Sequence, residues 1–320
     1  MDYHKRILEY DCGKEADRIC AFLREQLFAF KRKGLVVGLS GGIDSAVAAA
    51  LCVRAFGNRK VFGLILPEKE SSPVSEEYAR LHAEQLGIDA EKVDLTPALE
   101  AIGIYRKRDE IIRRFFPEYT PEHRIKITLP PDLLKREAFN IFSLVIDDGS
   151  GNIKSTRLDA SALNGIVAAT NTKQRMRMIH LYYYAEKMNF LVCGTTNRSE
   201  TVQGFFVKFG DGGVDIEPLA HLYKIQIYRM SEYLDVPEEI RRRPPSPDTY
   251  SFPVSDEEFF FRIPFEQLDL LLYAWENEIS VNRVSVEMGL DKEQVERAFR
   301  DFKTKHKATG HVRRLPPTLG

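Results

Sequence analysis

The residues best suited to chemistry lie in one short stretch, GLSGGIDS, at residues 38–45. It offers two hydroxyls, Ser40 and Ser45, and one carboxylate, Asp44, around a pair of glycines. A short apolar run that predicts a strand comes directly before it, and an alanine-rich run that predicts a buried helix follows. Unpaired backbone N–H groups and the positive end of the helix would meet there, so the stretch predicts a phosphate-binding turn.

Asp44 adds a condition, because a carboxylate repels phosphate unless a hard cation such as Mg²⁺ stands between them. The stretch lacks the lysine of GxxxxGK[ST] loops and the spacing of the GxGxxG dinucleotide motif. We therefore expect a metal-bound nucleotide held by hydroxyls and N–H groups. The alternative is a tight strand-to-helix turn in which the glycines serve sterics and Asp44 is a charge at the helix start.

The overall composition excludes several kinds of binding. With 46 Lys and Arg against 47 Asp and Glu, the net charge is -1, so no general basic field attracts nucleic acid or anionic lipid. The four cysteines are scattered without metal-ligand spacing, which favours a reducing compartment over a disulfide framework. No stretch approaches the about 18 apolar residues of a membrane span, and the N-terminus lacks an apolar signal region. We expect a cytoplasmic protein.

Regularly spaced apolar residues predict strands that alternate with helices. Strands are expected at residues 35–39, 61–66, 92–95 and 190–193. Helices are expected at residues 15–33, 46–56, 75–86, 161–188, 219–234, 265–275 and 292–305. Alternation of this kind is typical of a doubly wound parallel α/β sheet, which binds ligands at the carboxyl ends of its strands.

We interpret the chain as one domain, 1–320, with an insertion and a helical C-terminal region at about 264–320. The insertion covers about 105–159, which is too long for an ordinary connection. It contains a predicted hairpin, with strands at 141–146 and 153–157 around an Asp-Asp-Gly-Ser-Gly-Asn turn. Its apolar residues could form a small face of their own: Phe115, Phe116, Phe139, Phe142, Leu144 and Ile146.

Two further stretches carry chemically useful side chains, GTTNRSE at 194–200 and KFGDGGVD at 208–215. Together with SGGxDS, they make the chain resemble the PP-loop ATP pyrophosphatases, and among these the ammonia-dependent NAD synthetases. The resemblance covers nearly the whole chain outside the insertion. It implies that Asp44 and Glu200 bind Mg²⁺ and that Lys224 offsets negative charge on a departing pyrophosphate.

The resemblance also implies which residues hold the substrates. ATP is expected to contact Ser40, Gly41, Gly42, Ser45, Lys69, Thr195, Lys224 and Ser246. Deamido-NAD is expected to contact Asn171, Arg175, Asp211 and Asp215. The chain departs from the family pattern at Gln174, where alanine is usual, at Lys69, where arginine often stands, and at Ser246, which replaces threonine. Taken singly, such acids and lysines are commonly turn formers or solvated surface charges.

The implied reaction is an ATP-dependent amidation. ATP would activate the nicotinate carboxylate of deamido-NAD as an acyl-adenylate with release of pyrophosphate, and ammonia would then displace AMP. The implied assembly is a homodimer, and the ammonia is either free or delivered by a separate glutaminase. The alternative enzyme is a PP-loop amide ligase for another carboxylic acid, since the activation residues match the family better than the acceptor residues do.

A different class of function is suggested by residues 284–295, which have the look of a helix-turn-helix with glycine in its turn. The second helix mixes acids with bases, including Glu293, Glu296, Arg297 and Arg300. Such a surface is not a phosphate-binding stripe. Packing of two helices is therefore the preferred interpretation, and nucleic-acid binding is the weaker alternative.

Overall fold

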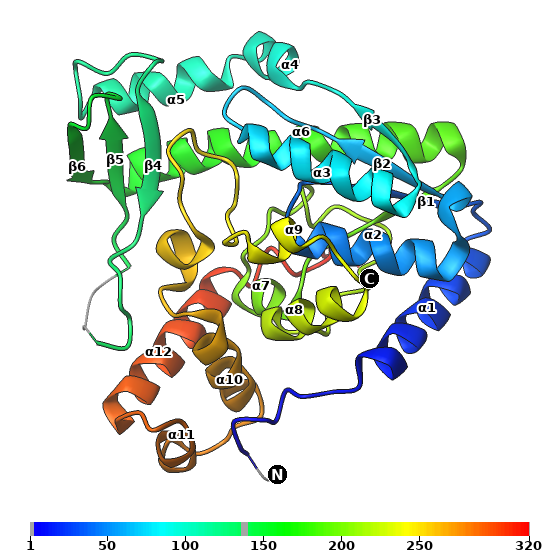
Figure 1. Ribbon diagram of the computed structural model, residues 1–320. Coiled ribbons are helices and arrows are strands. Elements are labelled where there is room, and N and C mark those ends of the chain that lie inside the picture. The colour runs from blue at the N-terminus through cyan, green and yellow to red at the C-terminus, as the bar shows by residue number, and fades with distance from the viewer. Residues whose placement is uncertain (1–2, 136–139, 320) are drawn as a thin grey trace.

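The computed structural model describes residues 3–135 and 140–319 (Figure 1). Its centre is a parallel sheet with the strand order β3-β2-β1-β7. The four strands are β1 Leu35–Gly38, β2 Val61–Ile65, β3 Asp89–Lys92 and β7 Leu191–Cys193. Because the chain runs from β1 outward to β3 on one side and returns as β7 on the other, the strand order switches at β1. Open α/β sheets bind their ligands at such a switch point.

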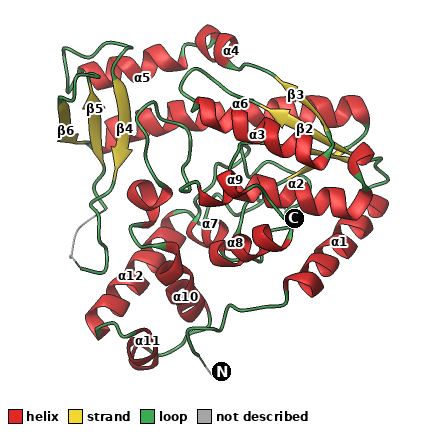
Figure 2. Ribbon diagram, in the orientation of Figure 1, coloured by secondary structure: helices red, strands yellow, loops and turns green. Residues whose placement is uncertain are grey.

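Helices cover both faces of this sheet, which confirms the predicted doubly wound α/β fold (Figure 2). Side chains alternate along β1, so that Leu35 and Val37 enter one core and Val36 enters the core on the opposite face. The first core takes α1 Cys12–Ala29, α2 Ile43–Phe56, α3 Pro73–Leu86, α8 Lys224–Tyr233 and α9 Glu238–Arg242. The second core takes α4 Thr96–Ala101, α5 Ile104–Arg113 and α6 Ala160–Met188.

Two elements differ clearly from the predicted bounds. The strand expected at 92–95 starts three residues earlier, as β3 at residue 89, because β3 is an exposed strand whose side chains give no apolar signal. Leu95 is fully buried, but it follows the strand and packs in the second core. The helix expected at 219–234 begins only at Lys224, since Tyr223 has extended backbone angles and occupies the capping position.

A second, antiparallel sheet lies within the predicted insertion and has the strand order β4-β5-β6. Its strands are β4 Arg124–Thr128, β5 Ser143–Asp147 and β6 Ile153–Arg157. The predicted hairpin is present as β5 and β6, whereas the short, charged strand β4 is an addition to the prediction. Leu144 and Ile146 pack with Ile166 of α6 in a separate core. Of the apolar residues expected on this face, Phe139 lies outside the described residues.

The C-terminal helices form a third unit with its own core, at the lower left of Figure 1. Its elements are the π-helix η2 Glu257–Phe261 and the helices α10 Phe265–Glu276, α11 Val281–Met288 and α12 Lys292–Ala308. Val284 of α11 and Val295 of α12 are fully buried in this core, so the helix pair serves packing. Two short elements complete the fold, η1 Asn58–Lys60 and α7 Arg198–Gln203. Within the described ranges, no helix is long and apolar enough to cross a membrane.

Candidate active site

The predicted phosphate-binding turn joins β1 to α2 at the carboxyl end of the central sheet. Gly41 adopts a φ of +72°, and a Cβ there would lie 2.3 Å from the carbonyl oxygen of Ser75, so only glycine fits. The hydroxyls of Ser40 and Ser45 lie 3.0 Å apart, and the N–H of Gly42 donates to Ser40 Oγ at 3.3 Å. No side chain caps the start of α2, which leaves its first N–H groups to an anion.

The three residues predicted to be catalytic, Asp44, Glu200 and Lys224, converge beside this turn. Nζ of Lys224 lies 2.6 Å from Oδ2 of Asp44 and 3.8 Å from Oε1 of Glu200. Each residue belongs to the first turn of a different helix, α2, α7 and α8 respectively. Because only 2% of Lys224 is exposed, it is not a solvated surface lysine.

Asn197 holds both carboxylates of this cluster and is absent from the predicted set. Its Nδ2 donates to Oδ1 of Asp44 at 2.9 Å, and its Oδ1 accepts the N–H of Glu200 at 3.1 Å. Oε2 of Glu200 in turn accepts the N–H of Asn197 at 3.1 Å, which completes a capping box at the start of α7. The Asn-x-x-Glu spacing is the sequence signal that identifies such a residue.

The cluster carries more negative than positive charge. Asp256, which is 4% exposed, adds a third carboxylate to the electrostatic surroundings of Lys224, and its Oδ1 has no hydrogen-bond partner. Burial, followed by the charge of Asp44, raises the pKa of Glu200 well above its usual value. Burial alone would lower the pKa of Lys224, but Asp44 and Glu200 raise it, so the ammonium group keeps its charge.

The donor set of this cluster fits Mg²⁺, which binds one or two protein carboxylates together with phosphate oxygens and water. Asp44 and Glu200 are the carboxylates that could bind the cation. Asp256 adds a third negative charge near Glu200, and one of its oxygens has no hydrogen-bond partner. In the part of the chain that the structure describes, no three acidic, histidine or cysteine side chains form a complete metal cage. A cation at this place would therefore take its remaining ligands from the substrate and from water.

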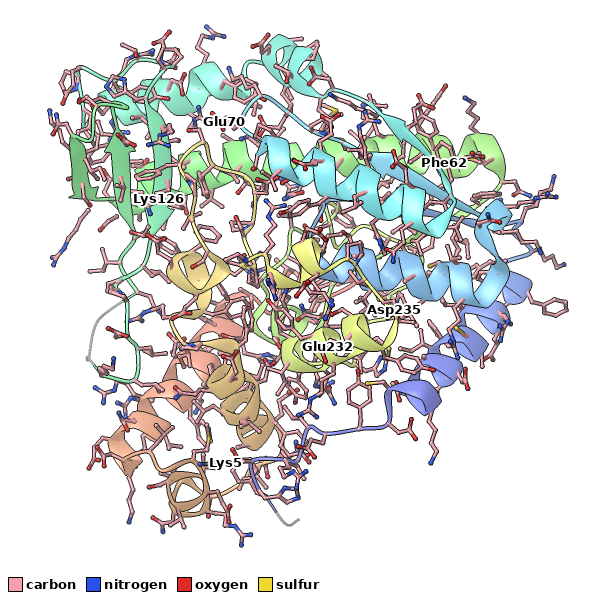
Figure 3. The ribbon with its side chains drawn as sticks, viewed as in Figure 1. Lys5, Phe62, Glu70, Lys126, Glu232 and Asp235 are labelled. Atoms are coloured by element: carbon pink, nitrogen blue, oxygen red, sulfur yellow. The ribbon has the colours of Figure 1, made fainter. Side chains whose placement is uncertain are left out.

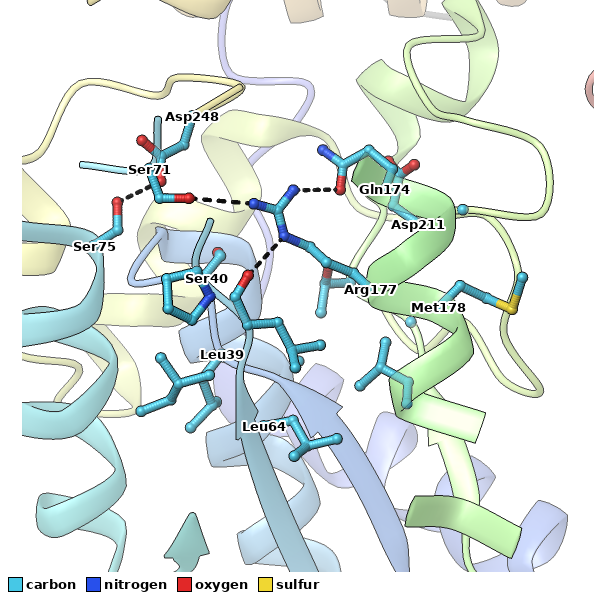
Figure 4. A pocket seen from close by; sticks show the side chains of 18 of the residues that line it. Leu39, Ser40, Leu64, Ser71, Ser75, Gln174, Arg177, Met178, Asp211 and Asp248 are labelled. Carbon is cyan, nitrogen blue, oxygen red and sulfur yellow. Dashed lines mark hydrogen bonds between the residues drawn. The ribbon is translucent and has the colours of Figure 1, made fainter. Parts of the chain in front are cut away.

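An open cavity lies beside the turn, at the carboxyl ends of β1, β2 and β7 (Figure 4). Its apolar wall is formed mainly by Leu39, Leu64, Met178 and Leu181. Three of the predicted site residues also line it: Ser40, Thr195 and Asp211. An apolar cavity with a few convergent polar groups has the usual form of a small-molecule site.

Arg177 of α6 reaches into this cavity, whereas the predicted residue Arg175 does not. Arg177 Nε donates to the carbonyl oxygen of Leu66 at 3.1 Å, and Nη1 donates to Oε1 of Gln174 at 3.0 Å (Figure 4). Arg175 is exposed, and its Nε donates to the carbonyl oxygen of Lys208 at 3.3 Å. Two residues along a helix point about 200° apart, so only one of the two arginines can face the cavity.

Asp215 and Asn171, also predicted to bind the acceptor, lie outside the cavity lining. Oδ2 of Asp215 accepts the N–H of Val192 at 2.7 Å, and its Oδ1 accepts the hydroxyl of Tyr182 at 3.1 Å. Asp215 therefore joins β7 to α6, which is a structural use of its carboxylate. Asn171 is partly exposed on α6, almost two turns before Arg177.

Lys69 and Ser246, predicted to contact ATP, are not part of the cavity lining either. Nζ of Lys69 lies 3.7 Å from the ring centre of Tyr105 and 3.6 Å from Oε1 of Glu100. Ser246 is exposed, and its Oγ accepts the N–H of Asp248 at 3.2 Å. Ser246 thus lies next to the cavity through its neighbour, since Asp248 is a lining residue.

Asp248 and Arg243 support the turn from behind and are further residues outside the predicted set. Oδ2 of Asp248 accepts the hydroxyl of Ser75 at 2.6 Å, and Oδ1 accepts the N–H of Ser72 at 3.1 Å. Nη2 of Arg243 donates to Oγ of Ser75 at 2.8 Å, and Nη1 donates to the carbonyl oxygen of Gly41 at 3.4 Å. These contacts attach the loop after α9 both to the start of α3 and to the glycine turn.

A buried ion-pair network stands behind the loop that follows β2. The side chain of Lys173 is only 1% exposed, and its Nζ lies 2.9 Å from Oε1 of Glu68 and 2.5 Å from Oε2 of Glu70. The same Nζ donates to the carbonyl oxygen of Thr249 at 2.9 Å. Arg108 of α5 lies 2.6 Å from Glu70, which is labelled in Figure 3. Burial alone would raise the pKa of Glu70, but Lys173 and Arg108 lower it to about 2. The network links α5 and α6 to two loops that border the cavity.

Comparison with known proteins gives a consistent result over most of the chain. The family model described as NAD synthase matches residues 15–114 and 140–316. The NH(3)-dependent NAD(+) synthetase of Rhizobium meliloti (strain 1021) is 47% identical over 312 residues, which are 98% of this chain and 93% of that protein.

Two solved structures have the same fold. The structure of NMN synthetase from Francisella tularensis matches with a TM-score of 0.67 and 25% identity, covering 97% of this chain and 99% of that one. The NH3-dependent NAD synthetase from Campylobacter jejuni matches with a TM-score of 0.64 and 23% identity, covering 98% and 100% respectively. With a family model matched from the first helix to the C-terminal tail and a relative of this identity, the chain belongs to the NAD synthase family.

Proposed function

We propose that this chain is an ammonia-dependent NAD synthetase, a ligase that converts the nicotinate carboxyl group of deamido-NAD into an amide. The observation that carries the proposal is the convergence of Asp44, Glu200 and Lys224 beside the glycine turn. The near-complete match to NH(3)-dependent NAD(+) synthetases supports it independently.

The proposed reaction has two steps. A carboxylate oxygen of deamido-NAD attacks the α-phosphorus of ATP, the bond to the β-phosphate oxygen breaks, and pyrophosphate leaves. Ammonia then attacks the carbonyl carbon of the acyl-adenylate, AMP leaves with the electron pair, and a proton is released. AMP is a good leaving group, so the protein needs mainly to position the partners and exclude water.

The triphosphate of ATP is proposed to lie along the glycine turn, with its adenosine in the apolar part of the cavity. Ser40, Ser45 and the free N–H groups at the start of α2 would hold the phosphates. The ammonium of Lys224, buried and charged, would offset the negative charge that builds up on pyrophosphate as it leaves. Thr195, which lines the cavity, would contact the nucleotide next to Ser40.

Asp44 and Glu200 are the residues that would hold Mg²⁺. When bound, the cation supplies charge neutralisation for the phosphate oxygens and orients them for in-line displacement. Asn197 would keep both carboxylates in place for the cation, because it binds one oxygen of Asp44 and caps the helix that carries Glu200.

The acceptor is proposed to approach from the side of the cavity that Asp211 lines. We retain Asn171, Arg175 and Asp215 as acceptor contacts that a second subunit would complete in a homodimer. Ile179 and Tyr183 of α6 are 53% and 58% exposed, and burying them between two chains would be favourable. Free cysteines and the use of ATP both fit a cytoplasmic protein.

The test is a product analysis of the purified chain with ATP, Mg²⁺, ammonium and deamido-NAD. We expect NAD, AMP and pyrophosphate in equal amounts, and stoichiometric ADP and phosphate would overturn the proposal. Nicotinate mononucleotide and other carboxylates should be compared in parallel, because the Francisella relative is named as an NMN synthetase. A higher kcat/KM with nicotinate mononucleotide than with deamido-NAD would assign the chain a different acceptor.

A further inference from the structure

Helix α10 carries two carboxylates, Asp269 and Glu276, that face the beginnings of α7 and α8, two of the three helices of the active-site cluster. The two residues are seven positions apart, which is close to two full helical turns and places them on one side of α10. α10 belongs to the C-terminal unit, where Leu268, Leu271 and Ala274 are fully buried. The helix is thus anchored independently of the central sheet.

Asp269 contacts α7 and α8 at the same time. It has no exposed surface, and its Oδ1 accepts the hydroxyl of Ser199 at 2.6 Å while its Oδ2 accepts the N–H of Ile225 at 2.8 Å. Oγ of Ser199 also accepts the N–H of Lys224 at 3.2 Å. One carboxylate therefore satisfies the first N–H groups of α8, directly and through Ser199, which directly precedes Glu200.

Glu276 repeats this arrangement two turns later. Its Oε1 lies 2.6 Å from Nη2 of Arg198, and its Oε2 accepts Nε–H of Arg198 at 3.1 Å, which is a bidentate pair. Oε2 also accepts the hydroxyl of Tyr223 at 2.6 Å. Arg198 is the first residue of α7 and Tyr223 is the cap of α8, so both carboxylates connect the same two helix starts.

These contacts matter because α7 and α8 are short. α7 has six residues and α8 has ten, and helices of this length depend on tertiary contacts for their stability and placement. Burying a carboxylate without an ion-pair partner costs free energy of folding. Burial accordingly raises the pKa of Asp269 to about 7. An apolar residue would fill the same space without that cost, so the carboxylate requires an explanation beyond packing.

We propose that Asp269 and Glu276 are positioning residues, which set the starts of α7 and α8 and thereby hold Glu200 and Lys224 at their working separation. The effect passes through Ser199 and Arg198 on one helix and through Tyr223 and the N–H groups of Lys224 and Ile225 on the other. The proposal rests on the proposed function for its kinetic consequence, whereas its structural consequence is independent of it.

The kinetic test compares removal of each carboxylate with its conservative replacement. Asp269→Ala should lower kcat about tenfold with the KM for ATP changed by less than about threefold, since a misplaced catalytic group mainly affects the transition state. Asp269→Asn can still accept from Ile225 and donate to Ser199, so it should recover most of kcat. Glu276→Ala and Glu276→Gln should behave in the same order. Glu266→Ala, at an exposed carboxylate in the first turn of α10, is the matched control with unchanged kcat.

If Asp269 had a purely structural role, Asp269→Ala would lower kcat by the same factor with or without Lys224. A double substitution therefore distinguishes a structural role from a positioning role. In a Lys224→Met background, Asp269→Ala should lower kcat by about threefold instead of about tenfold, because Lys224 is gone and only the effect on Glu200 remains. Full additivity of the two substitutions, or a wild-type kcat in folded Asp269→Ala and Glu276→Ala, would overturn the proposal. If Asp269→Ala does not fold, Ser199→Ala removes the link from Asp269 to α7, while Asp269 still accepts the N–H of Ile225.

Hydrogen exchange gives a readout that needs no activity. The amides at the starts of α7 and α8 should exchange at least about tenfold faster in Asp269→Ala than in Glu266→Ala, because the contacts that hold them closed are lost. Unchanged exchange would reject the positioning role even in an active enzyme. Absence of NAD formation by the wild-type chain would instead reject the proposed function and leave the exchange result standing.

Discussion

The ammonium of Lys224 and the carboxylate of Asp44 lie 2.6 Å apart, although 180 positions separate them in the chain. Glu200, 3.8 Å from the same ammonium, completes a cluster in which each residue begins a different helix. The positive ends of three helices therefore point toward one small volume. Of these three helix starts, that of α2 has no side-chain cap, and its first N–H groups would favour the proposed binding of a triphosphate beside the carboxylates.

The first prediction concerns the carboxylates that would bind the cation. Asp44→Asn and Glu200→Gln each remove a charged Mg²⁺ ligand with little change in volume, so kcat should fall by about 100-fold or more. Steady-state rates over a range of Mg²⁺ concentrations measure this effect. Asp17→Asn, at an exposed carboxylate on α1, is the matched control. Wild-type rates in both site variants, with unaltered thermal unfolding, would contradict their role.

The second prediction separates the two arginines of α6. Arg177→Ala should raise the KM for ATP about tenfold, because Arg177 lines the cavity and also holds Leu66 and Gln174 in place. Arg175→Ala should leave the KM for ATP within about twofold and raise the KM for deamido-NAD. Initial rates with each substrate varied in turn give both constants. A raised KM for deamido-NAD in Arg177→Ala, together with a raised KM for ATP in Arg175→Ala, would show that Arg177 binds the acceptor.

Arg175 and Arg177 illustrate which features of the site could be predicted from the sequence and which could not. The glycine turn, its strand and its helix are contiguous, so local spacing was enough to predict the turn. Arg175 and Arg177 are two positions apart, and the choice between them depends on how α6 is rotated against the sheet. That rotation is set by burial of residues such as Tyr184 and Ala185 in the second core, which no local pattern specifies.

Contacts between distant elements were beyond prediction for the same reason. Asp269 and Ser199 are 70 positions apart, and each has an ordinary local explanation as a helix residue. Strand β3 lacked an apolar signal because its side chains are exposed, although backbone pairing to β2 holds it in the sheet. Asn197, by contrast, was accessible to prediction, since its capping-box spacing lies within four residues.

The third prediction concerns stability and the buried network around Lys173. Lys173→Met leaves the carboxylates of Glu68 and Glu70 without their common cation, which should lower the free energy of unfolding by about 3–5 kcal/mol. Urea denaturation at neutral pH measures the change. Lys187→Met, at an exposed lysine on the same helix, should change the free energy by less than about 0.5 kcal/mol. Equal effects in the two variants would show that the network adds little.

The fourth prediction follows from the lowered pKa of Glu70. Its carboxyl has a pKa of about 2 in the folded chain, below the ordinary 4.5, so ionised Glu70 stabilises the folded state at pH values above 4.5. This contribution should be lost as the pH falls from 4.5 toward 2. Glu70→Gln should therefore show a weaker dependence of the free energy of unfolding on pH in this interval than the wild type. Identical pH profiles would place the pKa of Glu70 near its ordinary value.

The last prediction concerns the source of nitrogen. Hydrolysis of glutamine by covalent catalysis needs an accessible nucleophile, for which a thiolate is the common choice. Three of the four cysteines, Cys20, Cys52 and Cys193, are buried. Burial raises the pKa of Cys20, and the hydrogen bond with Cys52, followed by burial, raises the pKa of Cys193. A buried thiol of raised pKa is a poor nucleophile. This chain should accordingly form NAD with ammonium and show less than about 1% of that rate with glutamine at equal concentration.

The measurement is NAD formation with either nitrogen source, after removal of ammonia from the glutamine stock with glutamate dehydrogenase. Cys12 is partly exposed, so Cys12→Ser is the informative variant, and it should leave the ammonium-dependent rate unchanged. Glutamine-dependent formation of NAD that disappears in Cys12→Ser would identify a glutaminase activity in this chain. Glutamine-dependent formation that appears only when a separate glutaminase is added would instead support delivery of ammonia between proteins.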